Sequence, residues 1–350
     1  MPVGVLSRGA RRARLGAMLC VICATAGAVP GGATGDASGA ARGAAYGKAP
    51  PDRAANVFTD PLGHRVEWRT PPGRIVSLSP SLTEILFAIG HDATTIVGRT
   101  RFCNYPTAVE SIAKIGGIVD PSLEAILLLQ PDLVLATRGN PLEFMESLAR
   151  LGVPVYAVET DGGLARVFAS IAEVGALTGR EEQAGALVAH LSERLGRVVE
   201  RTAGLRATER PRVYYGEIEG AHWTAGPGSF IDDLIRLTGA DNVASIAPAA
   251  WSALSLEVIL ARDPQVYLGI LRDEDSARAY TRVVSDLQSL AGWRDTSLGH
   301  TPRVFLVHED RLQRPGPRLI DVLEELARFL HPELWADSSA AEGLLPEGPR

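Results

Sequence analysis

From Arg74 onward, short apolar runs rich in β-branched residues alternate with stretches in which apolar positions recur every three or four residues. The first pattern predicts buried strands and the second predicts helices. The predicted strands cover 75–78, 132–135 and 153–158, and the predicted helices cover 81–89 and 142–151. Such alternation is typical of βαβ units on a parallel sheet, so we expect an α/β fold.

One short motif occurs twice in the chain. The segment Ser122-Leu123-Glu124-Ala125-Ile126-Leu127, with Pro131 after it, returns 133 residues later as Ser255-Leu256-Glu257-Val258-Ile259-Leu260, with Pro264 after it. Each copy follows the same order of features: a predicted strand (75–78; 213–215), a serine-started helix (Ser81; Ser229) and a glycine (Gly90; Gly239). This repetition indicates a duplicated unit, and we expect two similar lobes rather than one large sheet.

A single amphipathic helix is expected between the two lobes. Apolar residues follow the i, i+3, i+4, i+7 spacing from Ala184 to Val199, with charged residues on the other faces. The pattern runs from Glu181 to about Arg201, which gives a helix roughly 30 Å long at 1.5 Å per residue. A connector of this length spans two small lobes and disfavours a large hinge closure.

The first 26 residues have the features of a secretory signal peptide. Arginines at 8, 11, 12 and 14 precede an apolar run from Leu15 to about Ala26, which ends in small residues. The run is shorter than the ~20 residues that cross a bilayer, which disfavours a membrane anchor. Cys20 and Cys23 follow large apolar residues, unlike the cysteine of a lipid anchor. We therefore predict export to the periplasm as a soluble mature protein.

Composition divides the rest of the chain. Residues 27–56 are mainly Gly, Ala, Pro and Ser, which predicts a disordered linker. Val57 and Phe58, a turn at 60–63, and Val66 and Trp68 predict a short hairpin that opens the fold. The expected division is a signal peptide at 1–26, a linker at 27–56, a first lobe at 57–165, a connecting helical segment at 166–208, a second lobe at 209–335 and a disordered tail at 336–350.

Charge and cysteine content exclude some partners and bonds. The net charge is −6 and the arginine cluster lies in the signal segment, so no basic surface for nucleic acid is expected. Removal of the signal leaves Cys103 alone, so no intramolecular disulfide can form. A buried, unreactive thiol is favoured over a metal-binding thiolate at this position.

Loops between the carboxyl end of a strand and the next helix line the cleft of an open α/β sheet. Three aromatic residues, Tyr105, Trp223 and Trp251, lie in such loops among Gly, Pro and Ala. They show no helical or strand periodicity, so we expect them to stack on a flat ligand, although anchoring of a loop is an alternative. Ser79 and Pro80 bring a helix N-terminus, which suits amide, carboxylate or phosphate groups, to the same cleft.

The stretch Arg74-Ile75-Val76-Ser77-Leu78-Ser79-Pro80-Ser81-Leu82-Thr83-Glu84 and the tetrapeptide Cys103-Asn104-Tyr105-Pro106 resemble class III periplasmic binding proteins of ABC importers. Members of this family carry cobalamin, ferric siderophores or haem. The similarity covers about Val57 to Leu334. It implies two Rossmann-like lobes joined by one long connecting helix, a ligand in the cleft, a permease dimer as partner, no cofactor and a monomeric state.

The resemblance also implies that one acidic residue on each lobe docks onto the permease, and Glu124 and Glu257 occupy those positions. A carboxylate in the first turn of a helix is favoured by the helix dipole by about 0.3–1 kcal/mol, which alone would explain either glutamate. The recurrence of the same side chain in both copies favours a two-point contact with a symmetric partner.

The cobalamin-binding branch of the family is the most similar. There, Tyr105 and Trp251 match aromatic positions of the pocket, Trp223 falls near a third, and Asp310 and Arg314 match polar contacts. Two tryptophans expected from that branch are missing, at 115–117 and at 136–138. A corrinoid is therefore the expected ligand. A ferric siderophore or haem is the alternative, with Arg138, Arg311 and Arg314 pairing with an anionic chelate.

Other classes of function have weaker support. An exported enzyme is not expected, because the chain has no His-Glu-x-x-His zinc helix, no Gly-x-Ser-x-Gly elbow and no triad signature. The glycines at 226 and 228 lack the lysine of a P-loop, which argues against nucleotide hydrolysis. Direct metal capture is disfavoured, because the cleft loops supply mainly His222, and 308–310 is one isolated cluster.

Overall fold

The computed structural model describes residues 55–336 except 273 and 274. The predicted signal peptide, the predicted linker up to residue 54 and the predicted tail from residue 337 lie outside these residues. The predicted hairpin is confirmed, since β1 (Asn56–Thr59) pairs antiparallel with β2 (Arg65–Trp68). Asp60 holds its turn by accepting from the N–H groups of Leu62 (2.9 Å) and His64 (2.8 Å), and it also accepts from Ala157 N (2.8 Å). The hairpin is thereby attached to the first lobe.

The first lobe is built on a parallel sheet with the strand order β5-β4-β3-β6-β7. The strands β3, β6 and β7 are fully buried, as expected for a parallel sheet covered on both faces, whereas the short edge strand β5 is exposed. The strands are β3 (Ile75–Ser77), β4 (Ile96–Arg99), β5 (Ala113–Lys114), β6 (Leu133–Thr137) and β7 (Val155–Val158), and the helices between them are α2 (Pro80–Ala88), η1 (Thr107–Ser111), α3 (Leu123–Leu128) and α4 (Leu142–Arg150). The strand order reverses beside β3, which is the topological switch point of this sheet.

The second lobe has its own parallel sheet with the order β10-β8-β12-β13. Its strands are β8 (Arg212–Tyr215), β10 (Asp241–Asn242), β12 (Val266–Leu271) and β13 (Val304–His308), and a separate antiparallel pair is formed by β9 (Trp223–Ala225) and β11 (Trp251–Ala253). The helices are η2 (Ala207–Glu209), α7 (Phe230–Leu237), α8 (Leu256–Ala261), α9 (Ser276–Ser289), η3 (Trp293–Asp295), α10 (Ser297–His300), α11 (Glu309–Leu312), α12 (Leu319–Leu330) and η4 (Pro332–Trp335). No hydrogen-bonded strand joins the two main sheets within the described residues.

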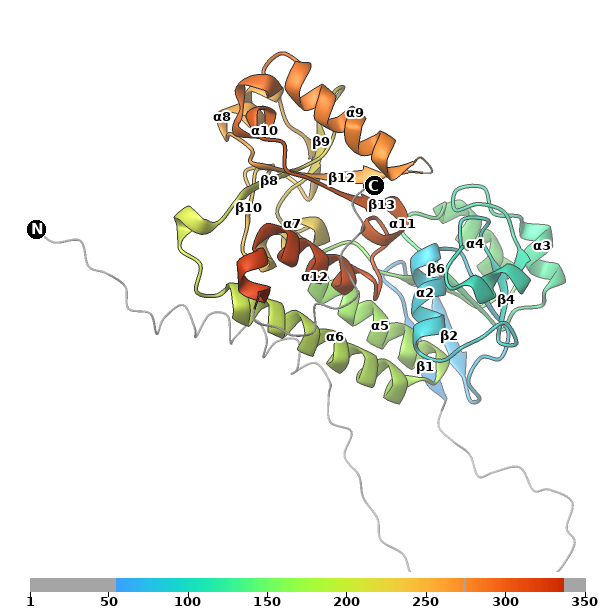
Figure 1. Ribbon diagram of the computed structural model, residues 1–350. Coiled ribbons are helices and arrows are strands. Elements are labelled where there is room, and N and C mark those ends of the chain that lie inside the picture. Colours follow the sequence, from blue (N-terminus) through green and yellow to red (C-terminus); the bar gives the residue numbers. More distant parts are fainter. Residues whose placement is uncertain (1–54, 273–274, 337–350) are drawn as a thin grey trace, which may run out of the picture.

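The predicted fold class is confirmed: two α/β lobes are joined by one long helix (Figure 1). This helix is α6 (Glu181–Thr202), and it packs against α5 (Leu164–Thr178), which the amphipathic pattern did not separate from it. The chain reverses between them at Gly179, whose φ of 68° is the left-handed conformation that glycine adopts without strain. The two helices lie side by side beneath both lobes (Figure 1).

One apolar core extends through both lobes. It includes Ile75 and Leu82 in the first lobe, Leu191 on α6, and Val213 and Leu319 in the second. Fully burying one such side chain stabilises the fold by about 1.5–3 kcal/mol. Rotating one lobe away from the other would expose part of this shared core, so the connection between the lobes is stiff.

Polar contacts reinforce the same connection. Arg194 on α6 donates to Asp321 (2.7 Å) and to Glu324 (3.0 and 2.9 Å) on α12. On the other side, Asp233 of α7 accepts from the N–H of Leu164 (2.9 Å) at the start of α5. A side chain at position 163 would collide with this carboxylate, which explains the glycine there.

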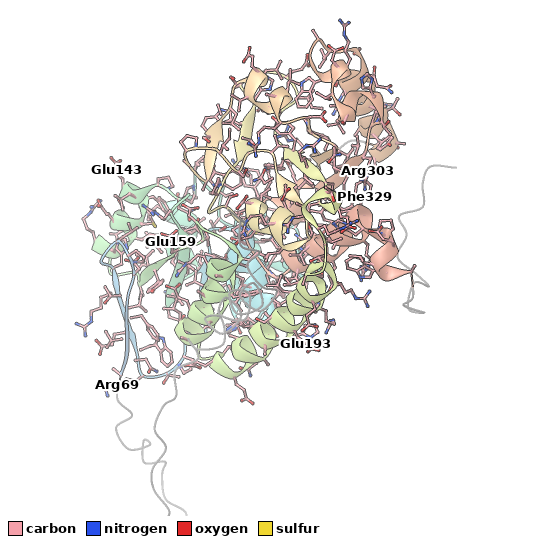
Figure 2. All side chains as sticks on the ribbon, turned by 90° about the vertical axis from the view of Figure 1, so that its left-hand side faces the viewer. Arg69, Glu143, Glu159, Glu193, Arg303 and Phe329 are labelled. Atoms are coloured by element: carbon pink, nitrogen blue, oxygen red, sulfur yellow. The ribbon has the colours of Figure 1, made fainter. Side chains whose placement is uncertain are left out.

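The outer surface of the lobes is polar. Glu193 on α6 is exposed and pairs with Arg197 at 2.8 Å, and Arg303 lies over the ring of Phe329 at 5.6 Å in the second lobe (Figure 2). Among the described residues, no helix is both long enough and apolar enough to cross a membrane.

His91, just after α2, is buried without any hydrogen-bond partner for either ring nitrogen among the described residues. Burial, followed by the charge of Arg180, lowers the pKa of His91 from 6.5 to about 4. Between these two values the unfolded chain binds the proton and the folded chain does not, so protons favour unfolding in this window.

We therefore expect the stability of the protein to fall as the pH drops from about 6.5 to about 4, with His91 contributing on the order of 2–3 kcal/mol of that loss. His91→Leu should flatten this part of the profile in urea unfolding measured across the pH range. The exposed His300, replaced in the same way, is the control. An unchanged pH slope in His91→Leu would show that other groups cause the acid sensitivity.

Candidate ligand-binding cleft

The carboxyl ends of the two sheets meet at a cavity of about 300 Å³. The first lobe contributes residues that follow β3, β4 and β5, and the second contributes residues that follow β13. The lining residues are Ser79, Pro80, Ser81, Phe102, Ile118, Glu309, Asp310, Gln313, Arg314 and Pro315. The cavity therefore lies at the switch point of the first sheet, where open α/β sheets bind ligands.

On the first-lobe side, the N-terminus of α2 borders the cavity. Pro80 occupies the first helical position, where its missing N–H and fixed φ cause no loss. Ser79 makes no capping bond; its hydroxyl instead lies 2.9 Å from the hydroxyl of Ser81. The positive end of the helix dipole and two hydroxyl groups thus border the cavity, an arrangement that suits carbonyl oxygens and anions.

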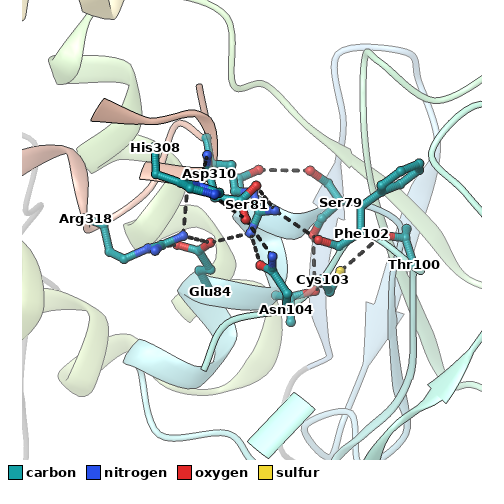
Figure 3. Close-up of polar contacts among 12 residues, drawn as sticks. Ser79, Ser81, Glu84, Thr100, Phe102, Cys103, Asn104, His308, Asp310 and Arg318 are labelled. Carbon is teal, nitrogen blue, oxygen red and sulfur yellow. Dashed lines mark hydrogen bonds and ion pairs between the residues drawn. The ribbon is translucent and has the colours of Figure 1, made fainter. Parts of the chain in front are cut away.

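On the second-lobe side, the structure brings Asp310 and Arg314 into the lining, but both also contact the first lobe. Arg314 donates to Glu84 (3.1 Å), to the side-chain oxygen of Asn104 (2.7 Å) and to the carbonyl of Phe102 (3.0 Å), and it pairs with Asp310. Asn104 donates to Asp310 at 2.6 Å. Figure 3 shows these contacts crossing from one lobe to the other.

Arg318 completes this network, which we call the interlobe latch: Glu84, Asn104, Asp310, Arg314 and Arg318. Arg318 donates to both oxygens of Glu84 (2.8 and 2.6 Å) and to the carbonyl of Asp310 (2.9 Å) (Figure 3). The Glu84 side chain is 2% exposed. Two arginines and two carboxylates give the latch no net formal charge, and the added hydrogen bonds offset the cost of burying the ions.

Several arginines outside the cavity lining also form ion pairs. Arg101 bonds Asp120 (2.9 Å), Arg138 bonds Glu159 (3.1 Å) and Arg272 bonds Glu309 (3.1 Å). Arg311, expected to meet an anionic chelate, bonds Glu325 on α12 at 2.6 Å. Each of the three arginines expected to bind an anion is therefore paired with a carboxylate of the chain, and of these three Arg314 belongs to the cavity lining.

The predicted stacking residues lie outside the lining of the cavity. Tyr105 is about half exposed, and the guanidinium of Arg318 covers one face of its ring at 4.2 Å. A ligand can therefore stack only on the other face. Phe102, three residues earlier and also half exposed, lines the cavity and was missed because no periodicity marks a ring in a turn.

Trp223 and Trp251 are on short strands, not in loops as expected. Trp223 pairs with Ala253 and Trp251 pairs with Ala225, which places both rings on one face of the β9–β11 pair as diagonal neighbours. The ring of Phe230 supports Trp251 edge-on at 5.6 Å between centroids. Both rings remain about half exposed and form a tryptophan platform.

No tryptophan occupies 115–117, and the structure gives no steric reason for its absence. A Cβ at Gly117 would meet the carboxylate of Asp120 and lie 2.7 Å from the guanidinium of Arg101, but both side chains are flexible and about half exposed. Arg101 also lies over the ring of Phe102 at 5.0 Å, so a cation–π pair stands at this edge of the cleft.

Cys103 and His308 do not form a metal site. Cys103 is buried and its sulfur lies 3.1 Å from the hydroxyl of Thr83 and 3.2 Å from that of Thr100. His308 Nδ1 accepts from the N–H of Asp310 at 3.3 Å, which leaves the proton of a neutral ring on Nε2. Within residues 55–336, apart from 273–274, no three His, Cys, Asp or Glu side chains are arranged to hold a metal ion.

Glu124 and Glu257 lie far along the chain from one another but in equivalent surroundings. Each is exposed in the first turn of a six-residue helix, α3 or α8, that follows a serine N-cap. In Glu257, hydrogen bonds from the residue's own backbone N–H and from the hydroxyl of Ser255 lower the pKa of the carboxyl group. Glu257 is therefore kept ionised. Neither glutamate belongs to the cavity lining.

Comparison with known proteins gives consistent matches. The family model described as periplasmic binding protein matches residues 75–310. A cobalamin-binding protein of Halobacterium salinarum is 30% identical over 267 residues, 74% of this chain and 70% of that protein. A vitamin B12-binding protein of Pectobacterium carotovorum is 26% identical over 74% of this chain and 88% of its own. Among solved structures, a periplasmic heme-binding protein from Roseiflexus is similar with a TM-score of 0.64 and 26% sequence identity. The match covers 75% of this chain and 98% of that protein's chain.

Removal of the negative charge at Glu84 tests the interlobe latch. Glu84→Gln leaves Arg314 and Arg318 facing a neutral amide, and loss of one partner from a buried ion pair costs about 3 kcal/mol or more. We expect a corresponding fall in the free energy of unfolding measured with urea. The exposed Glu143, replaced by Gln on α4, should change stability by less than about 0.5 kcal/mol. Equal effects of the two substitutions would argue against the latch.

Proposed function

We propose that this chain, which belongs to the periplasmic binding protein family, captures a corrinoid such as cobalamin in the cleft and delivers it to the permease of an ABC importer. Proteins of this family bind solutes outside the cytoplasm and are not enzymes. Export through a cleaved signal peptide at 1–26 and a monomeric state belong to the same proposal.

The charge balance of the cleft is the observation that carries this choice of ligand. Arg101, Arg138 and Arg272 are paired with carboxylates, and Arg314 and Arg318 belong to the latch. A corrinoid carries neutral amides around its macrocycle, so it needs hydrogen-bond donors and acceptors more than free cations. The hydroxyls of Ser79 and Ser81 and the N-terminus of α2 supply these.

Aromatic rings suit the flat part of such a ligand. A cavity of about 300 Å³ is smaller than a corrinoid, so the ligand would place only its side chains there and extend along the cleft. Phe102, the free face of Tyr105 and the tryptophan platform provide exposed rings for that extension. Asp310 and Arg314 would reach the ligand with the hydrogen-bonding capacity left over from the latch.

An anionic chelate, such as haem or a ferric siderophore, is the second candidate. The observation in its favour is the exposure of the Arg138–Glu159 and Arg272–Glu309 pairs, because exposed ion pairs contribute only about 0–1 kcal/mol and can exchange partners. The corrinoid is preferred because Arg311 and Arg314, two of the three arginines expected to bind an anion, are held by Glu325 and the latch.

Titration of the purified protein distinguishes these ligands. We expect cyanocobalamin and cobinamide to quench tryptophan fluorescence and to bind more tightly than haem or ferric siderophores in calorimetry. Trp251→Ala should weaken corrinoid binding about tenfold or more through lost stacking. Trp335→Ala, at the other end of the second lobe, should leave affinity unchanged. Tighter binding of the anionic chelates would favour the second candidate, and ester or phosphate hydrolysis without binding would favour an enzyme.

Docking is tested separately from capture. Glu124 and Glu257 are exposed on equivalent helices outside the cavity, which supports a role at the permease surface. We expect Glu124→Ala and Glu257→Ala to keep ligand affinity within about twofold while reducing transport about tenfold or more, since each removes one charge pair of the complex. Glu143→Ala, another first-turn glutamate, is the control. Parallel losses of affinity and transport would reassign the two residues to folding.

A further inference from the structure

The two proposed docking helices end in the same unusual way. Gln130 follows α3 and Asp263 follows α8, and each has a φ of 45°, a left-handed conformation rare for residues other than glycine. The two residues are 133 positions apart, and each precedes a proline. After each proline the chain enters an inner strand, β6 in the first lobe and β12 in the second. The helices have six residues each, too few to be stable without outside contacts.

One arginine holds each of these helix ends. Arg74 Nε donates to the carbonyls of Leu129 (3.0 Å) and Gln130 (3.2 Å), and its Nη2 donates to Leu129 at 2.6 Å. Arg212 Nε donates to the carbonyls of Arg262 (2.9 Å) and Asp263 (2.7 Å). The carbonyls that accept from the two Nε atoms are again 133 positions apart, so these contacts are equivalent. The Nη2 contacts differ, because that of Arg212 donates to the carboxylate of Asp263 at 2.7 Å.

The backbone of each arginine is bound to the same segment. The N–H of Asp132 donates to the carbonyl of Arg74 (3.0 Å) and that of Gln265 donates to the carbonyl of Arg212 (2.9 Å). The side chains of Asp132 and Gln265 accept from the N–H groups of Arg74 (2.9 Å) and Arg212 (3.1 Å). Different side chains, a carboxylate and an amide, thus perform one task in the two lobes.

This arrangement fixes a helix to the sheet. The last carbonyls of a helix lack intrahelical partners, and a guanidinium satisfies several of them while meeting the negative end of the dipole. Arg74 immediately precedes β3 and Arg212 begins β8, the central strands whose next residues, Ile75 and Val213, are fully buried. Each docking helix is therefore tied to an inner, buried strand of its lobe.

We propose that Arg74 and Arg212 are positioning residues for permease docking, which act by holding α3 and α8, and with them Glu124 and Glu257, at a fixed place on each lobe. This inference rests on the proposed docking function. It assigns to both arginines a role that neither ligand contact nor general packing requires, because Arg74 is exposed and both lie outside the cavity lining.

A double-mutant cycle separates positioning from simple stabilisation. Arg74→Met keeps the aliphatic stem and removes the donors; we expect it to weaken binding to the importer's permease–ATPase complex in nanodiscs about fivefold or more, with corrinoid affinity within about twofold. In the Glu124→Ala background the same change should alter permease binding less than about twofold. Arg74→Lys should restore part of the loss. Arg150→Met on α4, another exposed arginine, is the matched control.

If Arg74→Met weakened permease binding by the same factor in the wild-type and in the Glu124→Ala background, the positioning role would be overturned. Hydrogen exchange provides a readout that does not depend on the permease: α3 amides should lose protection in Arg74→Met while α4 amides do not. If Glu124→Ala itself leaves docking intact, the proposed docking function fails, whereas unchanged protection of α3 in Arg74→Met refutes the clamp directly.

Discussion

The structure depends on the fixed relation between its two lobes. A single apolar core passes from the first sheet through α5 and α6 into the second lobe, and Glu84 from α2 is buried between Arg314 and Arg318 of the opposite lobe. A buried carboxylate with two guanidinium partners is stable only when all three are held in place, because displacing one of them leaves a buried charge without its partner. The core resists rotation of the lobes at their base, and the latch resists their separation at the cavity. The width of the cleft is therefore set largely before a ligand enters, which limits the conformational cost of binding.

The latch also limits the charges that the cavity offers. Asp310 and Arg314 neutralise one another while they join the lobes, and Glu309 is paired with Arg272, which leaves hydroxyls, an amide side chain at Gln313 and the start of α2. Under the proposed function, recognition would then depend on the directions of hydrogen bonds and on ring contacts more than on charge. The exposed ion pairs of Arg138 and Arg272 are weaker and can exchange partners. Any selection for anions would therefore come from these arginines outside the cavity lining and not from the lining itself.

Local patterns in the sequence predicted part of the elements. The strands β3, β6, β7 and β8, the hairpin, the helices α2, α4 and α6 and the repeated α3 and α8 follow from hydrophobic period or motif, and each is confirmed. Other elements, among them β4, β12, α9 and α12, were not predicted. The separate helix α5 was not distinguished, because it lies between both lobes and is apolar on most faces. The strands carrying Trp223 and Trp251 have three residues, too few to show a period of two. Glu84 and Arg318 are 234 positions apart, and no local pattern connects residues that meet only through the packing of two lobes.

The similarity between the two lobes is not the same along the whole chain. From the serine N-cap to the start of β6 or β12 the spacing of 133 is kept, through the glutamate, the left-handed residue and the proline, whereas the two clamp arginines are 138 positions apart. On the cleft side the spacing is lost: α2 begins almost directly after β3, whereas the path from β8 to α7 is long enough to include β9 and Trp223. A partner with twofold symmetry requires the same surface from both lobes, while one asymmetric ligand requires different contacts from each. A symmetric permease would account for the constant spacing at α3 and α8. An asymmetric chelate would account for the different loops on the cleft side of the two lobes.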